Sequence, residues 1–184
     1  DNGSIPRVVV KATPAEGRGL SITGQPSLAG LEFQADSPLS VTQQFSVEVD
    51  VELNGILLLL NGSGMLNAGV KLEDAVLRVT GSPTISGVLI PRGSSELNLV
   101  EGSVLTMAQA FSLEGELLKV EGPGRLNNVQ VLTVGSQRTL RLNQTDVSGS
   151  LKLSGGMLKV EGSSKHSGDL SLEKDSEISV LDGA

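Results

Sequence analysis

The sequence has no cysteine, tryptophan or tyrosine, and three phenylalanines are its only aromatic residues among 184. Without cysteine the chain cannot form a disulfide scaffold or a metal site built on thiolates. Aromatic side chains bury the largest apolar areas in most globular cores, so Leu, Val and Ile must fill the core here. These side chains are slender enough to stack in narrow layers.

Positive charge and long apolar runs are also scarce. The formal net charge of −7 argues against a nucleic-acid binder, which needs clustered Lys and Arg, and against electrostatic docking on an anionic membrane. The longest apolar run, residues 56–60, is far too short to span a bilayer. No signal peptide is visible, and the chain starts at Asp1 without Met. We therefore expect a processed product or a fragment of a longer protein.

What the sequence does contain is a repeat. The string Leu-Lys-Val-Glu-Gly occurs at residues 118–122 and again at residues 158–162. Looser copies of the pattern apolar-x-apolar, often closed by Gly, start at Leu20, Leu39, Leu58, Leu77, Leu97, Leu118, Leu140, Leu158 and Ile178. Successive starts are 18 to 22 residues apart. A period near 20 residues indicates stacked repeats whose corners vary in length.

Within each unit the apolar residues alternate with a period of two, which predicts strands. A second alternating piece follows most starts, and Gly, Ser, Asn, Asp and Pro lie between the pieces as turn formers. Two or three short strands per turn describe a parallel β-helix. The predicted inward pairs are Leu77/Val79, Leu97/Leu99, Leu118/Val120, Leu140/Leu142, Leu158/Val160 and Ile178/Val180. Val100 and Leu181 are extra apolar residues in their units and predict a bulge or a tightened corner.

Residues 20–184 are thus predicted to form a solenoid of about nine coils, and residues 1–19 a lead-in or partial coil with a strand at residues 8–10. The main rival is an antiparallel sandwich, which also has short, regularly spaced strands. An antiparallel sandwich does not require the same string to recur at multiples of about 20 residues, whereas a stacked repeat does. Because open solenoid ends expose unpaired strand edges, we expect a longer chain or end-to-end stacking on another copy.

Residues 149–162 and 168–180 follow the pattern G-x-L-x-L-x-x-G-x-L-x-V. This stretch resembles passenger domains of bacterial autotransporters and filamentous haemagglutinin-type exoproteins, closely over residues 76–184 and loosely over residues 20–75. The resemblance implies an all-β, right-handed parallel β-helix (β-solenoid) with coils of about 20 residues. It also implies export to the cell surface and a role as adhesin, stalk or scaffold. The serine-protease motif of some autotransporters is not seen.

One repeat position is acidic. Glu101, Glu121, Glu161 and Asp182 share it, with Thr80 and Asn143 completing the column. Stacked carboxylates repel one another, and Ca²⁺ could bridge them. The competing interpretation is a solvated face on which Lys119 and Lys159 pair with Glu121 and Glu161, each pair contributing little. We favour it because Arg78 and Arg141 align with these lysines and because the calcium-binding repeat G-G-x-G-x-D is absent. We therefore predict no metal site and no cofactor. If calcium were bound, Glu101, Glu121, Glu161 and Asp182 would be the candidate ligands.

Catalysis has one candidate arrangement. His166, the only histidine, lies in a corner with Ser163, Ser164 and Ser167. Neighbours in a turn rarely converge into a Ser–His–acid geometry, so we predict no catalytic residue and no enzymatic activity. β-Helix polysaccharide lyases and hydrolases are the more serious alternative, but the missing Trp and Tyr argue against them. The pair Glu73 and Asp74 is expected to form a corner.

Asn2, Asn61 and Asn143 match N-x-S/T, and Asn61 and Asn143 are the glycosylation candidates. The sequence as a whole favours a non-enzymatic extracellular or cell-surface segment: a stalk, fibre or adhesin. The expected partners are other copies or segments of the same solenoid, and surface glycans or matrix proteins, with no nucleic acid and no membrane insertion. The alternatives are a carbohydrate-active enzyme and an intracellular filament former such as the bactofilins. Binding is expected where the repeat breaks, at the corners 91–96, 135–139 and 163–169.

Overall fold

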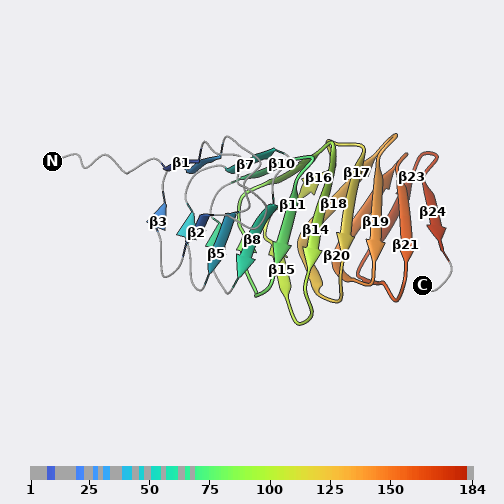
Figure 1. Ribbon diagram of the computed structural model, residues 1–184. Coiled ribbons are helices and arrows are strands. Elements are labelled where there is room, and N and C mark those ends of the chain that lie inside the picture. Colours follow the sequence, from blue (N-terminus) through green and yellow to red (C-terminus); the bar gives the residue numbers. More distant parts are fainter. Residues whose placement is uncertain are drawn as a thin grey trace.

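The computed structural model describes residues 69–181 throughout, apart from the side chain of Val129, and before residue 69 only the backbone of nine short strands. The described part of the chain is all β and contains no helix, so no helix in it could cross a membrane. Its strands pair in parallel and wind along one axis into a rod (Figure 1). The predicted β-solenoid with coils of about 20 residues is confirmed. The hand of the coil stays a prediction.

Three strands per turn give the rod three faces. Face 1 is a nine-stranded sheet of β2 (Leu20–Ile22), β5 (Leu39–Thr42), β8 (Leu57–Asn61), β11 (Val76–Val79), β14 (Ser94–Leu99), β17 (Leu117–Glu121), β19 (Thr139–Asn143), β21 (Met157–Glu161) and β24 (Glu177–Val180). Face 2 contains β3 (Ser27–Leu28), β6 (Ser46–Val47), β9 (Met65–Leu66), β12 (Thr84–Ile85), β15 (Val104–Met107), the first parts of β18 (Arg125–Gly135) and β20 (Asp146–Ser154), and β22 (Lys165–Ser167). Face 3 contains β1 (Val8–Val10), β4 (Leu31–Phe33), β7 (Val51–Asn54), β10 (Val70–Glu73), β13 (Leu89–Arg92), β16 (Phe111–Ser112), the second parts of β18 and β20, and β23 (Leu170–Glu173).

Every predicted start falls in a strand of face 1, from Leu20 in β2 to Ile178 in β24. The six strands from β11 to β24 belong to the turns that the structure describes in full. The strand predicted at residues 8–10 is β1, which pairs in parallel with β4 on face 3. The division of the chain at residue 20 stays a prediction.

The core is a set of apolar ladders along the axis. Both predicted inward residues are buried in each of β11, β14, β17 and β19, and Leu158 is buried in β21. Faces 2 and 3 add their own ladders, for example Leu105–Leu126–Val147 and Phe111–Leu132–Leu151. The alternating pattern therefore places Leu and Val where each coil can cover the one before it. In the last described turn, Ile178 and Val180 continue the ladder but are exposed.

The register between β14 and β17 differs from the sequence alignment. The alignment places Leu97 beside Leu118, whereas the structure pairs Leu97 with Val120 and Ser95 with Leu118. A shift of two residues keeps every side chain on the same side of the sheet, so the inward and outward assignment survives. It puts the hydroxyl side chain of Ser95 in a fully buried position.

The corner predicted at Val100 is a tight turn. The Ser103 N–H and its Oγ both donate to the Val100 carbonyl, at 2.9 and 2.6 Å, and Gly102 has a φ of 75°. The turn ends β14 at Leu99 and leads directly into β15. The tightened corner is therefore confirmed at this unit.

Strands β18 and β20 run through the corner between faces 2 and 3. Their register shifts between Asn127, which pairs with Ser148, and Val131, which pairs with Ser150. Gly149 is the single residue opposite this bulge, and its φ is 105°. A Cβ there would lie 1.7 Å from the Asn128 carbonyl oxygen, so the two coils can approach this closely only because residue 149 is glycine.

Candidate functional site

The outer surface of face 1 carries the predicted acidic column in a changed form. Register places Glu121, Asn143 and Glu161 in one row, but Asn98 and not Glu101 lies beside Glu121. The assignment of Glu101 to this row is therefore wrong: it is exposed in the turn after β14. The fourth calcium candidate, Asp182, lies outside the described residues. Among the described residues no three His, Cys, Asp or Glu side chains are grouped to hold a metal ion.

The neighbouring row of face 1 is basic. Lys119, Arg141 and Lys159 are in register on β17, β19 and β21, with Glu96 beside Lys119 on β14. Neighbouring strands lie about 4.8 Å apart along the rod axis, so these positively charged side chains repel one another unless acidic side chains lie beside them. The acidic row beside them supplies these. Face 1 thus carries acidic and basic side chains in adjacent rows.

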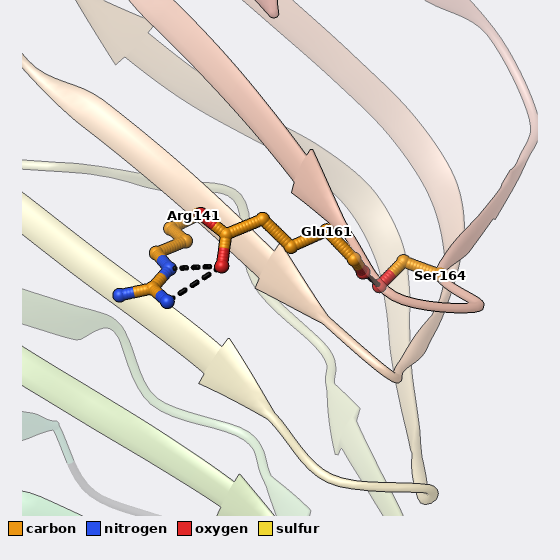
Figure 2. A network of polar contacts seen from close by, with 3 residues as sticks. All are labelled: Arg141, Glu161 and Ser164. Atoms are coloured by element: carbon orange, nitrogen blue, oxygen red, sulfur yellow. Dashed lines mark hydrogen bonds and ion pairs between the residues drawn. The ribbon is translucent and has the colours of Figure 1, made fainter. Parts of the chain in front are cut away.

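The ion pair on this face joins two coils. Nε and the Nη2 atom of Arg141 lie 2.9 and 2.5 Å from one carboxylate oxygen of Glu161 (Figure 2). The hydrogen bond to Glu161 raises the pKa of Arg141 above its ordinary value, with smaller support from the charges of Glu121 and Glu96. The sequence predicted pairing within one strand, between Lys and Glu two residues apart. The pair found here instead links β19 to β21.

Ser164, which the sequence named only as a candidate partner of His166, continues this network. Ser164 Oγ donates to the Glu161 carbonyl at 2.7 Å (Figure 2). It also accepts the Thr145 N–H of the previous coil at 3.3 Å. Ser176 makes the same two contacts, to the Glu173 carbonyl and from the Gly155 N–H. Ser95 bonds the Arg92 carbonyl at 2.7 Å and lies 3.4 Å from the Ala75 nitrogen. These serines close a corner and tie it to the coil before.

A polar groove lies on the described surface at the corner between face 3 and face 1. We call it the corner groove, and it has a volume of about 440 Å³. It is lined by Glu73, Arg92, Gly93, Glu114, Gly115, Glu116, Ser136, Gln137 and Arg138. Two of the three predicted binding corners, 91–96 and 135–139, therefore stack into one site. The third, residues 163–169, lies elsewhere: it leaves face 1 after β21, includes β22 on face 2 and leads to β23 on face 3.

The two arginines of the corner groove are both engaged. Arg92 Nε and Nη2 each lie 2.8 Å from one carboxylate oxygen of Glu114 on the next coil. Arg138 Nη1 donates to the Leu113 carbonyl. Glu73 and Glu116 line the groove beside these pairs. The groove thus presents carboxylates and guanidinium groups together, a combination that can donate and accept hydrogen bonds to a polar ligand such as a sugar.

The backbone of this corner is shaped by glycine and by Asp74. Asp74, with a φ of 49°, turns the chain after Glu73, and its carboxylate accepts the Ser94 N–H at 2.7 Å. The corner predicted at these two acidic residues is confirmed. A Cβ at Gly115 would lie 2.4 to 2.5 Å from the backbone of Arg92 and Gly93. The coils of the groove are therefore in direct backbone contact.

His166 is not in a loop but in strand β22, in register with the buried Val147. Its Nε2 lies 3.0 Å from the Gly149 carbonyl oxygen. Ser164, one of its candidate partners, directs its hydroxyl to the Glu161 carbonyl. The structure therefore gives both side chains backbone partners at corners of the solenoid.

Of the two glycosylation candidates, Asn143 lies on the outer row of face 1 between Glu121 and Glu161 and is half-buried. Asn61 ends β8, beside Thr42 of β5, and its side chain lies outside the described part. The asparagine that ends a face 1 strand is thus close to a corner in both cases.

Comparison with known proteins found no match to any protein-family model, curated protein or solved structure.

Proposed function

We propose that the protein is a non-enzymatic structural rod of the cell surface or extracellular space: a stalk, fibre or adhesin segment. The observation that supports this best is the continuous apolar ladder, in which Leu77, Leu97, Val120 and Leu142 lie in register and are buried. Each added coil lengthens such a rod by about 4.8 Å without changing its cross-section. That property suits a spacer.

The contacts between coils support the same role. The ion pairs Arg92–Glu114, Arg125–Asp146, Arg141–Glu161 and Lys152–Glu173 all join residues of adjacent coils. The corner serines add bonds in the same direction. Single exposed ion pairs contribute little stability, but here they align with the ladder and resist bending or shearing of one coil over the next. Surface glycans or matrix proteins would bind at the corners, where the residues do not follow the repeated apolar pattern.

A second candidate function is carbohydrate-active enzyme, and the corner groove is the observation that favours it. Three glutamates and two arginines line one recess. Paired carboxylates on opposite sides of a glycosidic bond are the usual machinery of glycoside hydrolysis. In this groove one carboxylate oxygen of Glu114 is already engaged by both Nε and Nη2 of Arg92, so this carboxylate is not free to face a substrate. We therefore place the structural role first.

Incubation with acidic and neutral polysaccharides is expected to release no new chain ends above the buffer control. Electron microscopy of the same protein is expected to show rods. Reproducible turnover that Glu114→Gln or Glu116→Gln abolishes, while Glu101→Gln outside the groove does not, would replace the structural role by the enzymatic one. Protease added to intact cells tests the location: cleavage supports exposure at the surface, and full protection contradicts it.

A further inference from the structure

The corner between face 3 and face 1 lengthens along the rod. The strands on either side of it stay in register, and the path between their inward residues grows by one residue per coil, from five residues to eight: Leu72 to Leu77, Pro91 to Leu97, Leu113 to Val120, and Val134 to Leu142. A longer path between ends that stay in register must bow outward. The corner groove lies on this step: Glu73 and Arg92 belong to the shorter corners, and residues 136–138 to the longest of the four.

Both arginines of the corner groove are held in place by protein acceptors. Arg92 Nε and Nη2 each lie 2.8 Å from the same carboxylate oxygen of Glu114, and Arg138 Nη1 donates to the Leu113 carbonyl. A guanidinium group has five N–H donors, so each arginine keeps donors for a ligand. Because the two groups are already oriented, a ligand that accepts from them loses less free energy in ordering these side chains.

Carboxylates and neutral polar groups lie beside these donors. Glu73 is half-buried and Glu116 is exposed, and both line the groove together with Glu114. Ser136 and Gln137, on the outermost corner, are exposed and add neutral donors and acceptors. None of the lining residues is aromatic. Recognition in this groove therefore depends on hydrogen bonds and not on stacking of a ring.

The balance of charge in the groove selects the ligand class. Three carboxylates and two guanidinium groups give a formal net charge of −1. An anion would lie against the carboxylates, and a cation against the fixed guanidinium groups. A hydroxyl group both donates and accepts, so a neutral polyol can use every one of these side chains.

The dimensions of the groove suit a chain of sugar rings. Glu73, Arg92, Glu114 and Arg138 come from four successive coils, so at about 4.8 Å per coil the groove extends roughly 14 Å along the rod. Its volume of about 440 Å³ lies within the range of small-molecule sites.

We propose that the corner groove binds a neutral oligosaccharide. Sugar hydroxyl groups donate to the carboxylates of Glu73, Glu114 and Glu116 and accept from the guanidinium groups of Arg92 and Arg138. The inference rests on the structural role proposed above, and it names the site and the class of surface glycan through which the rod would attach.

Isothermal titration calorimetry with probes of different charge tests the ligand class. The neutral probes are hexasaccharides of mannose, xylose and N-acetylglucosamine, the anionic probe is a galacturonate hexamer, and the cationic probe is a capped lysine hexapeptide. We expect at least one neutral hexasaccharide to bind at up to millimolar concentration, and to bind more tightly than either charged probe. Binding of none of the neutral probes, or tighter binding of a charged one, would overturn the proposal.

Variants of the chain test the site. Arg138→Met and Glu116→Ala should each weaken binding of the neutral hexasaccharide about tenfold, since each removes a hydrogen bond to a charged group. The matched controls are Arg125→Met and Glu101→Ala, which change the same charges at exposed positions outside the groove and should leave binding unchanged. Circular dichroism should show all four variants folded. Equal affinities for the groove and control variants would contradict the site.

The outcomes for the ligand and for the structural role are distinguishable. A protein that forms rods in electron micrographs but binds no neutral hexasaccharide would leave the structural role intact and remove the proposed ligand. Release of new chain ends from a bound hexasaccharide would confirm a sugar site but contradict the non-enzymatic role.

Discussion

Val120→Asp is expected to lower the free energy of unfolding by about 3–5 kcal/mol. Val120 lies in the middle of β17, fully buried, with Leu97 on one side of it in the ladder and Leu142 on the other. A carboxylate at this position has apolar neighbours in both directions and no cation within the ladder to pair with. It must either stay charged without a partner or take up a proton, and both states cost free energy.

The measurement is urea unfolding followed by far-ultraviolet circular dichroism, since the chain has no tryptophan to report by fluorescence. Lys119→Ala is the matched control one residue away. Lys119 points outward on the same strand, and its loss should cost less than about 1 kcal/mol. Equal midpoints for the two variants would show that the assignment of inward and outward residues in β17 is wrong.

Gly149→Ala is expected to cost more than about 3 kcal/mol for a different reason. The Cβ of alanine would lie 1.7 Å from the Asn128 carbonyl oxygen, and the φ of 105° is one that alanine rarely adopts. Both the backbone strain and the collision must be relieved by separating β18 from β20 at the bulge. Separation would also disturb the carbonyl that His166 contacts.

Two other glycines separate strain from collision. Gly102 also has a positive φ, 75°, but open space surrounds its missing Cβ, so Gly102→Ala should cost only the strain, about 1–2 kcal/mol. Gly135→Ala has the end of the Arg138 side chain as its nearest neighbour, at 3.4 Å, and should be close to neutral. Thermal unfolding of the three variants should rank them 149, 102, 135 in decreasing cost. A Gly149→Ala protein as stable as Gly135→Ala would contradict the corner geometry.

The sequence was sufficient to predict the strands of face 1 and which of their residues point inward. A period of two and a repeat near 20 residues are properties of the sequence, and an error in aligning one unit with the next does not change them. The register of β14 against β17 was not predictable in the same way. A shift of two residues leaves the alternation unchanged, so the pattern around Leu97 fits Leu118 and Val120 equally well. The hydrogen bonds of the corners decide between them.

The corner groove was only partly predictable for the same reason. The breaks in the repeat at residues 91–96 and 135–139 indicated two of its segments. Whether these segments lie at the same corner depends on the number of residues in each strand before the corner, which the repeat does not fix. Glu114 and Glu116 between them gave no separate signal. The structural role of the corner serines was also missed, although Ser164 was named as a catalytic candidate, because the N–H that Ser164 or Ser176 accepts belongs to a residue 19 or 21 positions away. A search for Ser three residues after the end of a face 1 or face 3 strand would have found both.

The most direct test of the parallel solenoid is an intramolecular disulfide between adjacent coils. In the structure Asn98 and Glu121 are in register on the outer side of β14 and β17, so the double variant Asn98→Cys/Glu121→Cys should close a disulfide within one molecule on mild oxidation. Glu101→Cys/Glu121→Cys, the pair that the sequence alignment places together, should stay reduced under the same conditions. Peptide mapping that finds the 98–121 link supports stacked parallel coils with this register. Free thiols at both positions, or closure of 101–121 instead, would contradict it.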